Sequence, residues 1–299
     1  MEGTVYQNIK SVLANYPEYE YFRNGKLGMR EYLLFLDNNV EQLESAGLNE
    51  DQMHLSSRFS INEDAKIDSI LLDLKAQGII ETINYPKLEF ESFREKVYSE
   101  YIHESQSTYI FPEEERLIYA LSQILEPKST ILLGSYYGYW GIWAMPAIQR
   151  VQGKAYYIDI DKKVSDLALA NHLKLGFSQE AEMIVDDAIQ FSKNSSQTYD
   201  FVLLDAELPA DHPNEDLRGK AIYFALAQAI APKLQTNAVM IAHNILLSNV
   251  TEDPYYSKKI SKNLKELGKF LSFANRNFDF AKDYNTSEGV GLYHGYRNS

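Results

Sequence analysis

The chain has 299 residues, of which 45% are hydrophobic and 24% are charged, a balance typical of a globular protein with a sizeable core. Its formal net charge of −13 disfavours non-specific binding to nucleic-acid phosphates, and the lack of cysteine excludes disulfides, thiolate zinc sites and cysteine nucleophiles. No apolar run approaches the roughly 20 residues that span a bilayer, and the first residues lack the features of a signal peptide, so we expect a cytoplasmic protein.

The first hundred residues show no alternation of strands and helices and are predicted to be mainly helical. Within residues 61–85, one helical face is followed by Gly78 and then by a β-like run, an order that occurs in winged-helix modules. The apolar face consists of Ile67, Ile70, Leu71 and Leu74. Because the segment is acidic, we favour a helical cap or a dimerisation arm over residues 1–105, with a second domain over residues 106–299.

Short apolar runs alternate with helical patterns in the second half of the chain. Runs typical of buried strands cover residues 130–133, 155–158, 182–185, 201–204 and 238–242, and the tail predicts two more strands at 270–280 and 290–297. Helices are predicted from Pro112, over 164–175 with Gly176 as the cap, and over 222–229. This order predicts an α/β fold with a doubly wound, mostly parallel seven-stranded sheet.

A glycine loop follows the first of these strands, in the stretch "ILLGSYYGYWGIWAM" at residues 131–145. Gly134 and Gly138 allow the backbone to approach a ligand closely, and ligands of such sheets bind beyond the carboxyl ends of the strands. The dinucleotide pattern GxGxxG is not met, because Tyr136 stands at its second glycine. The loop therefore favours a ligand without a pyrophosphate.

Polar side chains stand at the ends of the next four predicted strands. In chain order they are Asp159, then Asp186 and Asp187, then Asp205, and finally His243 and Asn244. A carboxylate after the second strand can accept hydrogen bonds from ribose hydroxyls, and one after the third can accept from an adenine amino group. Each acid alone is as well explained by a helix N-cap, but the whole set predicts a nucleoside site.

In this order, the motifs resemble the class I S-adenosylmethionine-dependent methyltransferases, and most of all the small O-methyltransferases of the catechol and caffeoyl-CoA type. The resemblance rests on "TYIFPEEERLIYAL", "GSYYGYW", "IDIDKKVSDLALANHLKLGF", "VDDAIQF", "YDFVLLDA" and "MIAHNILLSNV". It implies a Rossmann-like methyltransferase fold with S-adenosylmethionine as the cofactor. The expected reaction is methylation of a small molecule, at a hydroxyl in a biosynthetic pathway, by a homodimer that binds neither nucleic acid nor membrane.

The resemblance also implies roles for individual residues. The glycine loop would lie beside the methionine part of the cofactor, Asp159 would hold the ribose, and Asp187 would face the adenine. The implied cofactor-binding set is Gly134, Ser135, Tyr136, Gly138, Trp140, Asp159, Asp187, Ala188 and Asp205. The rings of Tyr136, Tyr139, Trp140 and Trp143 could face the sulfonium, although Trp140 and Trp143 are as well explained as core residues on a helix face.

Three positions depart from the family pattern. Leu132 replaces an acid associated with the methionine end of the cofactor, and Leu208 replaces the catalytic lysine. His243 replaces an aspartate that, together with the strand-four aspartate and an asparagine, binds a divalent cation, commonly magnesium. The implied metal ligands here are Asp205, His243 and Asn244, and the imidazole either favours a transition metal or removes the site.

Some group must take the proton from a hydroxyl acceptor. We expect His243, beside Asp205, to be this base, because the ordinary histidine pKa of about 6.5 suits neutral pH. The polar loop at 207–220 offers further candidates: Asp211, His212 and Lys220.

Two other functions stay open. The departures from the family pattern are compatible with a protein that binds the cofactor without turnover. A nucleic-acid methylase or regulator would use the winged-helix-like segment, but the acidic charge argues against it.

Overall fold

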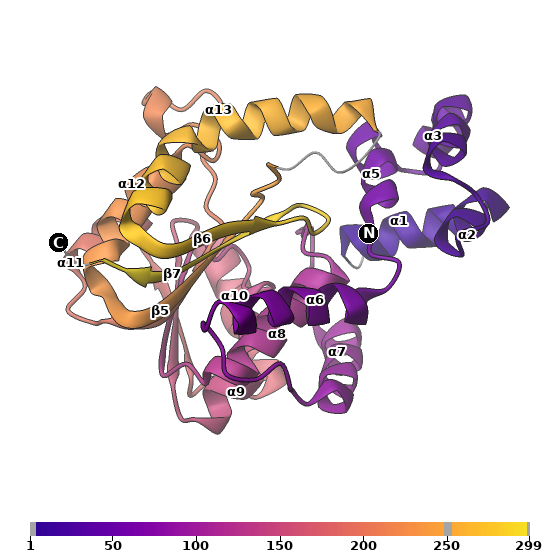
Figure 1. The fold of residues 1–299 in the computed structure, drawn as a ribbon. Coiled ribbons are helices and arrows are strands. Elements are labelled where there is room, and N and C mark those ends of the chain that lie inside the picture. The colour runs from indigo at the N-terminus through magenta and orange to yellow at the C-terminus, as the bar shows by residue number, and fades with distance from the viewer. Residues whose placement is uncertain (1–3, 248–252, 298–299) are drawn as a thin grey trace.

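A seven-stranded sheet forms the centre of the structure, a computed structural model that describes residues 4–247 and 253–297 (Figure 1). The strands are β1 (Ser129–Leu133), β2 (Lys154–Asp159), β3 (Ala181–Val185), β4 (Tyr199–Leu204), β5 (Leu234–His243), β6 (Phe278–Tyr284) and β7 (Val290–Tyr296). Their order is β3-β2-β1-β4-β5-β7-β6, with β1 to β5 parallel and β7 antiparallel to both of its neighbours. The predicted doubly wound, mostly parallel seven-stranded sheet is therefore confirmed. The end of the "MIAHNILLSNV" motif, residues 248–250, lies outside the described residues.

Helices cover both faces of this sheet, because the central strands are apolar on both sides. Leu132 of β1 packs into the core below α8 (Pro112–Leu125), α9 (Met145–Arg150) and α10 (Lys162–Leu175). Its neighbours Ile131 and Leu133 point the other way, into the core below α12 (Ile222–Ile230) and α13 (Pro254–Asn277). The short helix α11 (Ala188–Asn194) follows β3. Within the described ranges, no helix combines the length and the apolar character needed to cross a bilayer.

Two predicted strand segments are wrong. Residues 270–277 continue α13, and β6 begins only at Phe278, because Leu267, Phe270 and Ala274 recur at helical spacing and are buried together. The β-like run after Gly78 forms no strand either. Residues 79–86 have no regular secondary structure and connect α6 (Glu63–Ala76) to α7 (Lys87–Glu100), and Ile80 is buried in the core without belonging to a strand. The winged-helix-like pattern therefore lacks its strand.

The N-terminal region is helical, as predicted, but its helices belong to two cores. The first five are α1 (Val5–Leu13), α2 (Pro17–Arg23), α3 (Met29–Asn38), α4 (Val40–Ser45) and α5 (Glu50–Leu55), followed by a 3-10 turn, η1 (Ser56–Arg58). They close around a core of their own, in which the rings of Phe22 and Tyr32 stack with centroids 4.2 Å apart. Helices α6 and α7 instead share the core of α8 and the sheet. The boundary near residue 105 stays a prediction.

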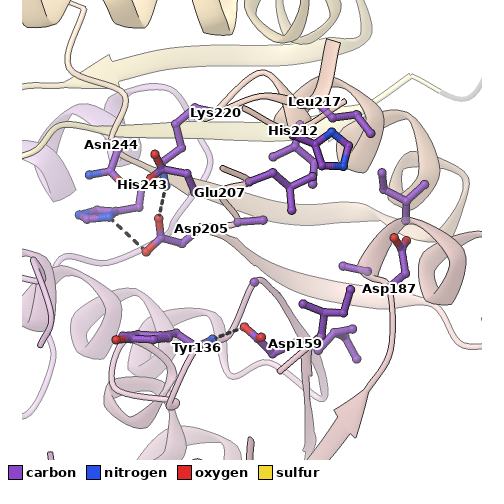
Figure 2. A pocket seen from close by; sticks show the side chains of 18 of the residues that line it. Tyr136, Asp159, Asp187, Asp205, Glu207, His212, Leu217, Lys220, His243 and Asn244 are labelled. Atoms are coloured by element: carbon purple, nitrogen blue, oxygen red, sulfur yellow. Dashed lines mark hydrogen bonds and ion pairs between the residues drawn. The ribbon is translucent and has the colours of Figure 1, made fainter. Parts of the chain in front are cut away.

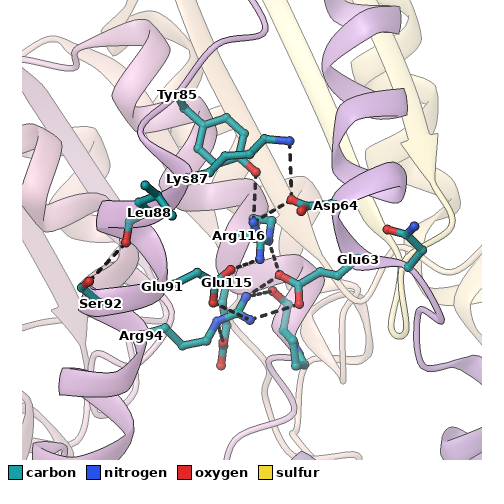
Figure 3. A network of polar contacts seen from close by, with 12 residues as sticks. Glu63, Asp64, Tyr85, Lys87, Leu88, Glu91, Ser92, Arg94, Glu115 and Arg116 are labelled. Atoms are coloured by element: carbon teal, nitrogen blue, oxygen red, sulfur yellow. Dashed lines mark hydrogen bonds and ion pairs between the residues drawn. The ribbon is translucent and has the colours of Figure 1, made fainter.

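A network of two largely buried arginines and partly exposed carboxylates joins α6, α7 and α8 (Figure 3). Arg116 of α8 contacts Glu63, Glu91 and Asp64, the last with Nη1 2.8 Å from Oδ1. Arg94 of α7 also contacts Glu63. Both guanidinium groups lie over the ring of Phe90, at 4.5 Å for Arg116 and 4.2 Å for Arg94. The two arginines thus fix the last two N-terminal helices to the helix that precedes β1.

Replacing Arg116 with methionine should therefore destabilise the protein, because the carboxylates around it lose their counter-ion. The arginine is 6% exposed, but two of its three partners are about half exposed, so we expect a loss of about 2–3 kcal/mol, below the range for a fully buried pair. Urea unfolding measures this loss. Arg150→Met is the matched control, since the Arg150–Glu126 pair is exposed and should contribute almost nothing. Equal midpoints for the two variants would contradict the prediction.

Candidate active site

The carboxyl ends of β1 to β5 surround a cavity of about 520 Å³ (Figure 2). The predicted strand-end residues that line it are Gly134, Tyr136, Asp159, Asp186, Asp187, Ala188, Asp205, His243 and Asn244. Ser107 to Ile110, from the segment before α8, close another side. Parallel strands end at the same edge of a sheet, which explains why residues more than a hundred positions apart meet here.

Three residues of the loop after β1 have positive φ: Gly134, Tyr136 and Gly138. Gly134 has φ +78°, and a Cβ on it would lie 2.4 Å from Ala206 Cα, so only glycine lets the ends of β1 and β4 approach this closely. Tyr136 has φ +50°, a conformation uncommon for residues other than glycine. Its backbone N–H donates to Asp159 Oδ2 at 2.7 Å. This contact holds the loop against the end of β2.

Several loop residues lie elsewhere than the sequence suggested. Ser135 and Trp140 line a small adjoining cavity of about 30 Å³ rather than the main one. Gly138 faces α10, because a Cβ there would lie 2.9 Å from His172 Cε1. Trp140 and Trp143 are both buried in the hydrophobic core, as the core interpretation expects, and Tyr139 is buried there too.

The two acids expected to bind the nucleoside both reach the main cavity. Asp159 Oδ1 accepts a hydrogen bond from the Asp161 N–H at 3.0 Å, and burial raises the pKa of this carboxyl. Asp187 Oδ1 accepts from the Gln190 N–H at 2.9 Å and so caps α11. The N-cap explanation therefore applies to one oxygen of Asp187, while its side chain also lines the cavity.

A chain of alternating charges lies at the other end of the cavity. Asp205, at the end of β4, accepts a hydrogen bond from Lys220 Nζ through Oδ1 at 2.9 Å. Its Oδ2 lies 3.3 Å from Nδ1 of His243, an ion pair outside hydrogen-bond geometry. His243 Nε2 is 3.1 Å from Glu114 Oε2, at the start of α8. The side chains of His243 and Glu114 are 2% and 0% exposed, so this pair is closed to solvent.

These contacts set the charge of each group. Burial alone would lower the pKa of His243, but Asp205 and Glu114 outweigh it and raise that pKa to about 10. Burial would raise the pKa of Asp205, but the cations Lys220 and His243 bring it down to about 2. At neutral pH His243 is an imidazolium, which has no lone pair to accept a proton. The surroundings of His243 therefore do not give it an ordinary pKa, and its role as a base stays a prediction.

His212, the second predicted catalytic histidine, lines the same cavity at a distance from this centre. Figure 2 shows it across the cavity from His243, on the loop after β4. Its Nδ1 contacts the backbone of Asn214 at 3.2 Å. His212 thus borders the cavity without taking part in the Asp205 charge chain.

The sequence analysis missed Glu114 and undervalued Lys220. Glu114 stands in a run of three glutamates that marks a helix start, where acids are ordinarily exposed, yet all three are buried. A long polar loop separates Lys220 from Asp205 in the sequence. Nothing in the spacing of these two residues shows that the loop returns to the end of β4. An isolated Leu208–Gly219 bridge closes that loop.

The residues here do not fit a divalent metal ion. A metal bound to Asp205 would lie beside the Lys220 ammonium, which would repel it, and His243 Nε2 is already engaged by Glu114. Asn244 Nδ2 instead donates to Glu288 Oε2 at 3.4 Å. Across residues 4–247 and 253–297, no three His, Asp or Glu side chains are arranged to hold a metal ion. The predicted metal set of Asp205, His243 and Asn244 therefore becomes a set of ion-paired and hydrogen-bonded side chains.

Comparison with known proteins agrees with this geometry. A family model described as O-methyltransferase matches residues 81–214. Over these residues, somewhat less than half of the chain, the sequence is similar to the O-methyltransferases. The prediction of a class I S-adenosylmethionine-dependent methyltransferase is thereby confirmed, and the protein is a methyltransferase. Asp159, Asp187 and Asp205 lie within the matched residues, whereas Lys220 and His243 follow them.

Solved structures share the fold of this methyltransferase. The SAH-bound methyltransferase PaMTH1 from Podospora anserina is 13% identical, with a TM-score of 0.51 over 76% of this chain and 96% of that one. A caffeoyl-CoA O-methyltransferase candidate from Staphylococcus aureus is 14% identical, with a TM-score of 0.50 over 76% and 98%. Among curated proteins, no sequence matches significantly. At these identities the likeness supports the fold alone.

The charge state of His243 in this methyltransferase can be measured directly. Both ring nitrogens should carry a proton at neutral pH, which ¹⁵N chemical shifts of the imidazole report. Because its folded pKa is raised, the stability it adds is complete below the ordinary value of about 6.5 and is lost as the pH rises through about 10. The groups that face the ring are Glu114, Asp205 and, more remotely, Glu288. A neutral tautomer at neutral pH would contradict this charge assignment.

Proposed function

We propose that the protein transfers the methyl group of S-adenosylmethionine to an oxygen atom of a small molecule. The observation that carries this proposal is the division of one cavity into two chemically different ends (Figure 2). Asp159 and Asp187 border one end and suit the hydroxyl and amino groups of a nucleoside. Asp205, Lys220 and His243 border the other, where charged groups are available for an acceptor.

Two observations support the cofactor assignment: the volume of the cavity, and the structure of PaMTH1, which was solved with S-adenosylhomocysteine (SAH). At about 520 Å³, the cavity falls within the range typical of small-ligand sites. Asp159 would accept from the ribose hydroxyls, Asp187 and Ala188 would border the adenine, and Gly134 and Tyr136 would border the methionine part. Leu132 supplies no acceptor for the cofactor amine, so that amine must bind to another group of the loop.

Methyl transfer is an in-line displacement, in which an oxygen lone pair forms the new O–CH₃ bond as the S–CH₃ bond breaks. The protein contributes chiefly by orienting the two reactants, which can supply about 7–11 kcal/mol. The acceptor oxygen would lie near Lys220, at the end of the cavity opposite Asp187. Glu114 would act as a positioning residue, because it holds His243 and, through it, Asp205.

The N-terminal region would support this site as a cap or as an arm between subunits. Arg58, in η1, donates to the carbonyl oxygens of Ser287 and Thr286 at 2.8 and 2.7 Å. Thr286 Oγ1 in turn donates to Glu114 Oε1 at 2.6 Å. The first core is thus linked by hydrogen bonds to the residue that holds His243.

A second candidate function is cofactor binding without turnover. It is favoured by the protonated state of His243 and by Leu208, which together leave the charge chain without a neutral base. Retained S-adenosylmethionine binding with no methylation across a broad panel of phenols, enols and carboxylic acids would support this candidate over the enzyme.

Asp159→Asn tests the cofactor assignment. Loss of a charged acceptor should weaken S-adenosylmethionine binding by about 1.5–3 kcal/mol, or roughly 10- to 150-fold, because the amide accepts ribose hydrogen bonds less strongly. Isothermal titration calorimetry gives the affinity, and circular dichroism checks the fold. Asp166→Asn, at an exposed aspartate paired with Lys162, is the matched control. Unchanged affinity in Asp159→Asn would remove Asp159 from the binding site.

A further inference from the structure

The acceptor end of the cavity contains cations where a metal-dependent enzyme would have a metal ion. Lys220 comes from the residues just before α12, and its side chain is 9% exposed while still lining the cavity. Nζ is held by Asp205 Oδ1 at 2.9 Å and lies 3.7 Å from Glu207 Oε2. The ammonium group is therefore fixed in place beside the space where the acceptor must bind.

The same contacts occupy the groups of the Asp205 charge chain. Asp205 is engaged by a cation on each of its oxygens, and His243 lies between two carboxylates. Tyr223 donates its hydroxyl hydrogen to the His243 carbonyl oxygen at 3.0 Å. Each of these three groups therefore already has a charged or polar partner inside the protein. A neutral hydroxyl bound here would have no group in the charge chain to which it could give its proton.

We propose, building on the methyl-transfer function above, that the acceptor binds as an oxyanion, with its ionised oxygen against Lys220 Nζ, and that neither a metal ion nor a protein base takes part. The chemical class is an acidic oxygen nucleophile, such as an ionised phenol or enol, or a carboxylate. An ammonium ion beside a poorly solvated oxyanion stabilises it strongly, which is what a divalent cation does in a metal-dependent site.

The step balances without an added reactant. One lone pair of the oxyanion forms the O–CH₃ bond, and the S–CH₃ bonding pair stays on sulfur. The sulfonium loses its positive charge, and the acceptor loses its negative charge. The products are S-adenosylhomocysteine and a neutral methyl ether or ester, and no proton is transferred to the protein. Lys220 remains an ammonium ion throughout, paired with Asp205.

Equilibrium binding of two probes to the protein saturated with S-adenosylhomocysteine tests this proposal. 4-Nitrophenol reports its own ionisation by absorbance, and benzoate represents the carboxylates. We expect at least one probe to bind, and bound nitrophenol to be ionised below its solution pKa. Lys220→Met should weaken that binding at least about tenfold, and Lys220→Arg should recover part of it, while the affinity for S-adenosylhomocysteine stays unchanged. Which probe binds more tightly distinguishes a phenolate site from a carboxylate site.

Lys162→Met is the matched control, since Lys162 is 73% exposed on α10 and paired with Asp166. It should bind the probes as the wild type does. Titration with Mg²⁺ and Mn²⁺ should detect no metal site at Asp205, so Asp205→Asn should leave metal binding unchanged. A chelator should not change the turnover of any acceptor.

The proposal is overturned if neither probe binds in the millimolar range, if nitrophenol binds in its neutral form, or if Lys220→Met binds the probes normally. Metal-dependent methylation of a neutral hydroxyl would also overturn it, yet leave the methyl-transfer function standing. Failure to bind S-adenosylmethionine would instead refute that function.

Discussion

The ion pairs of His243 are the constraint on which the active end of the sheet depends. A buried imidazolium is stable only while both of its carboxylates, Glu114 and Asp205, remain in place, because removing either leaves an uncompensated charge out of water. Glu114 is itself fixed by Thr286 and by the backbone N–H of Glu288 at 3.2 Å. One histidine therefore ties together the start of α8, the ends of β4 and β5, and the segment between β6 and β7.

This constraint gives the cavity its two unlike ends. At the β2 and β3 end, Asp159 and Asp187 line the cavity together with apolar side chains such as Ile189, and the N–H of Tyr136, a residue with positive φ, donates to Asp159. At the β4 and β5 end, Asp205 is already neutralised by two cations. A cationic cofactor and an anionic acceptor would therefore meet between walls that match their charges, and the reaction cancels both charges.

The helices before β1 belong to this arrangement rather than lying apart from it. Glu115, next to Glu114 on α8, accepts hydrogen bonds from Tyr98 of α7 and from Tyr139 of the glycine loop, each at 2.8 Å. Arg94, in the network of Figure 3, lies 3.5 Å from the same carboxylate. The charges that hold α6 and α7 thus extend to the loop after β1. A substitution in those helices can consequently change the shape of the cavity without touching it.

The sequence by itself determined the sheet, its parallel core and the polar residues at the strand ends, because buried strands are continuous apolar runs and each strand end is adjacent to its own loop. It also gave the family and, at Leu208 and His243, the departures from it. Only the tertiary structure decided which charges face each other. Glu114 lies 129 residues from His243, and Lys220 reaches Asp205 across a loop. The charge state of a histidine depends on such distant partners and on burial, so the ordinary histidine pKa did not predict the charge of His243. Residues 270–277 differ, because the helical spacing of Leu267, Phe270 and Ala274 was present in the sequence and their common burial shows which pattern applies.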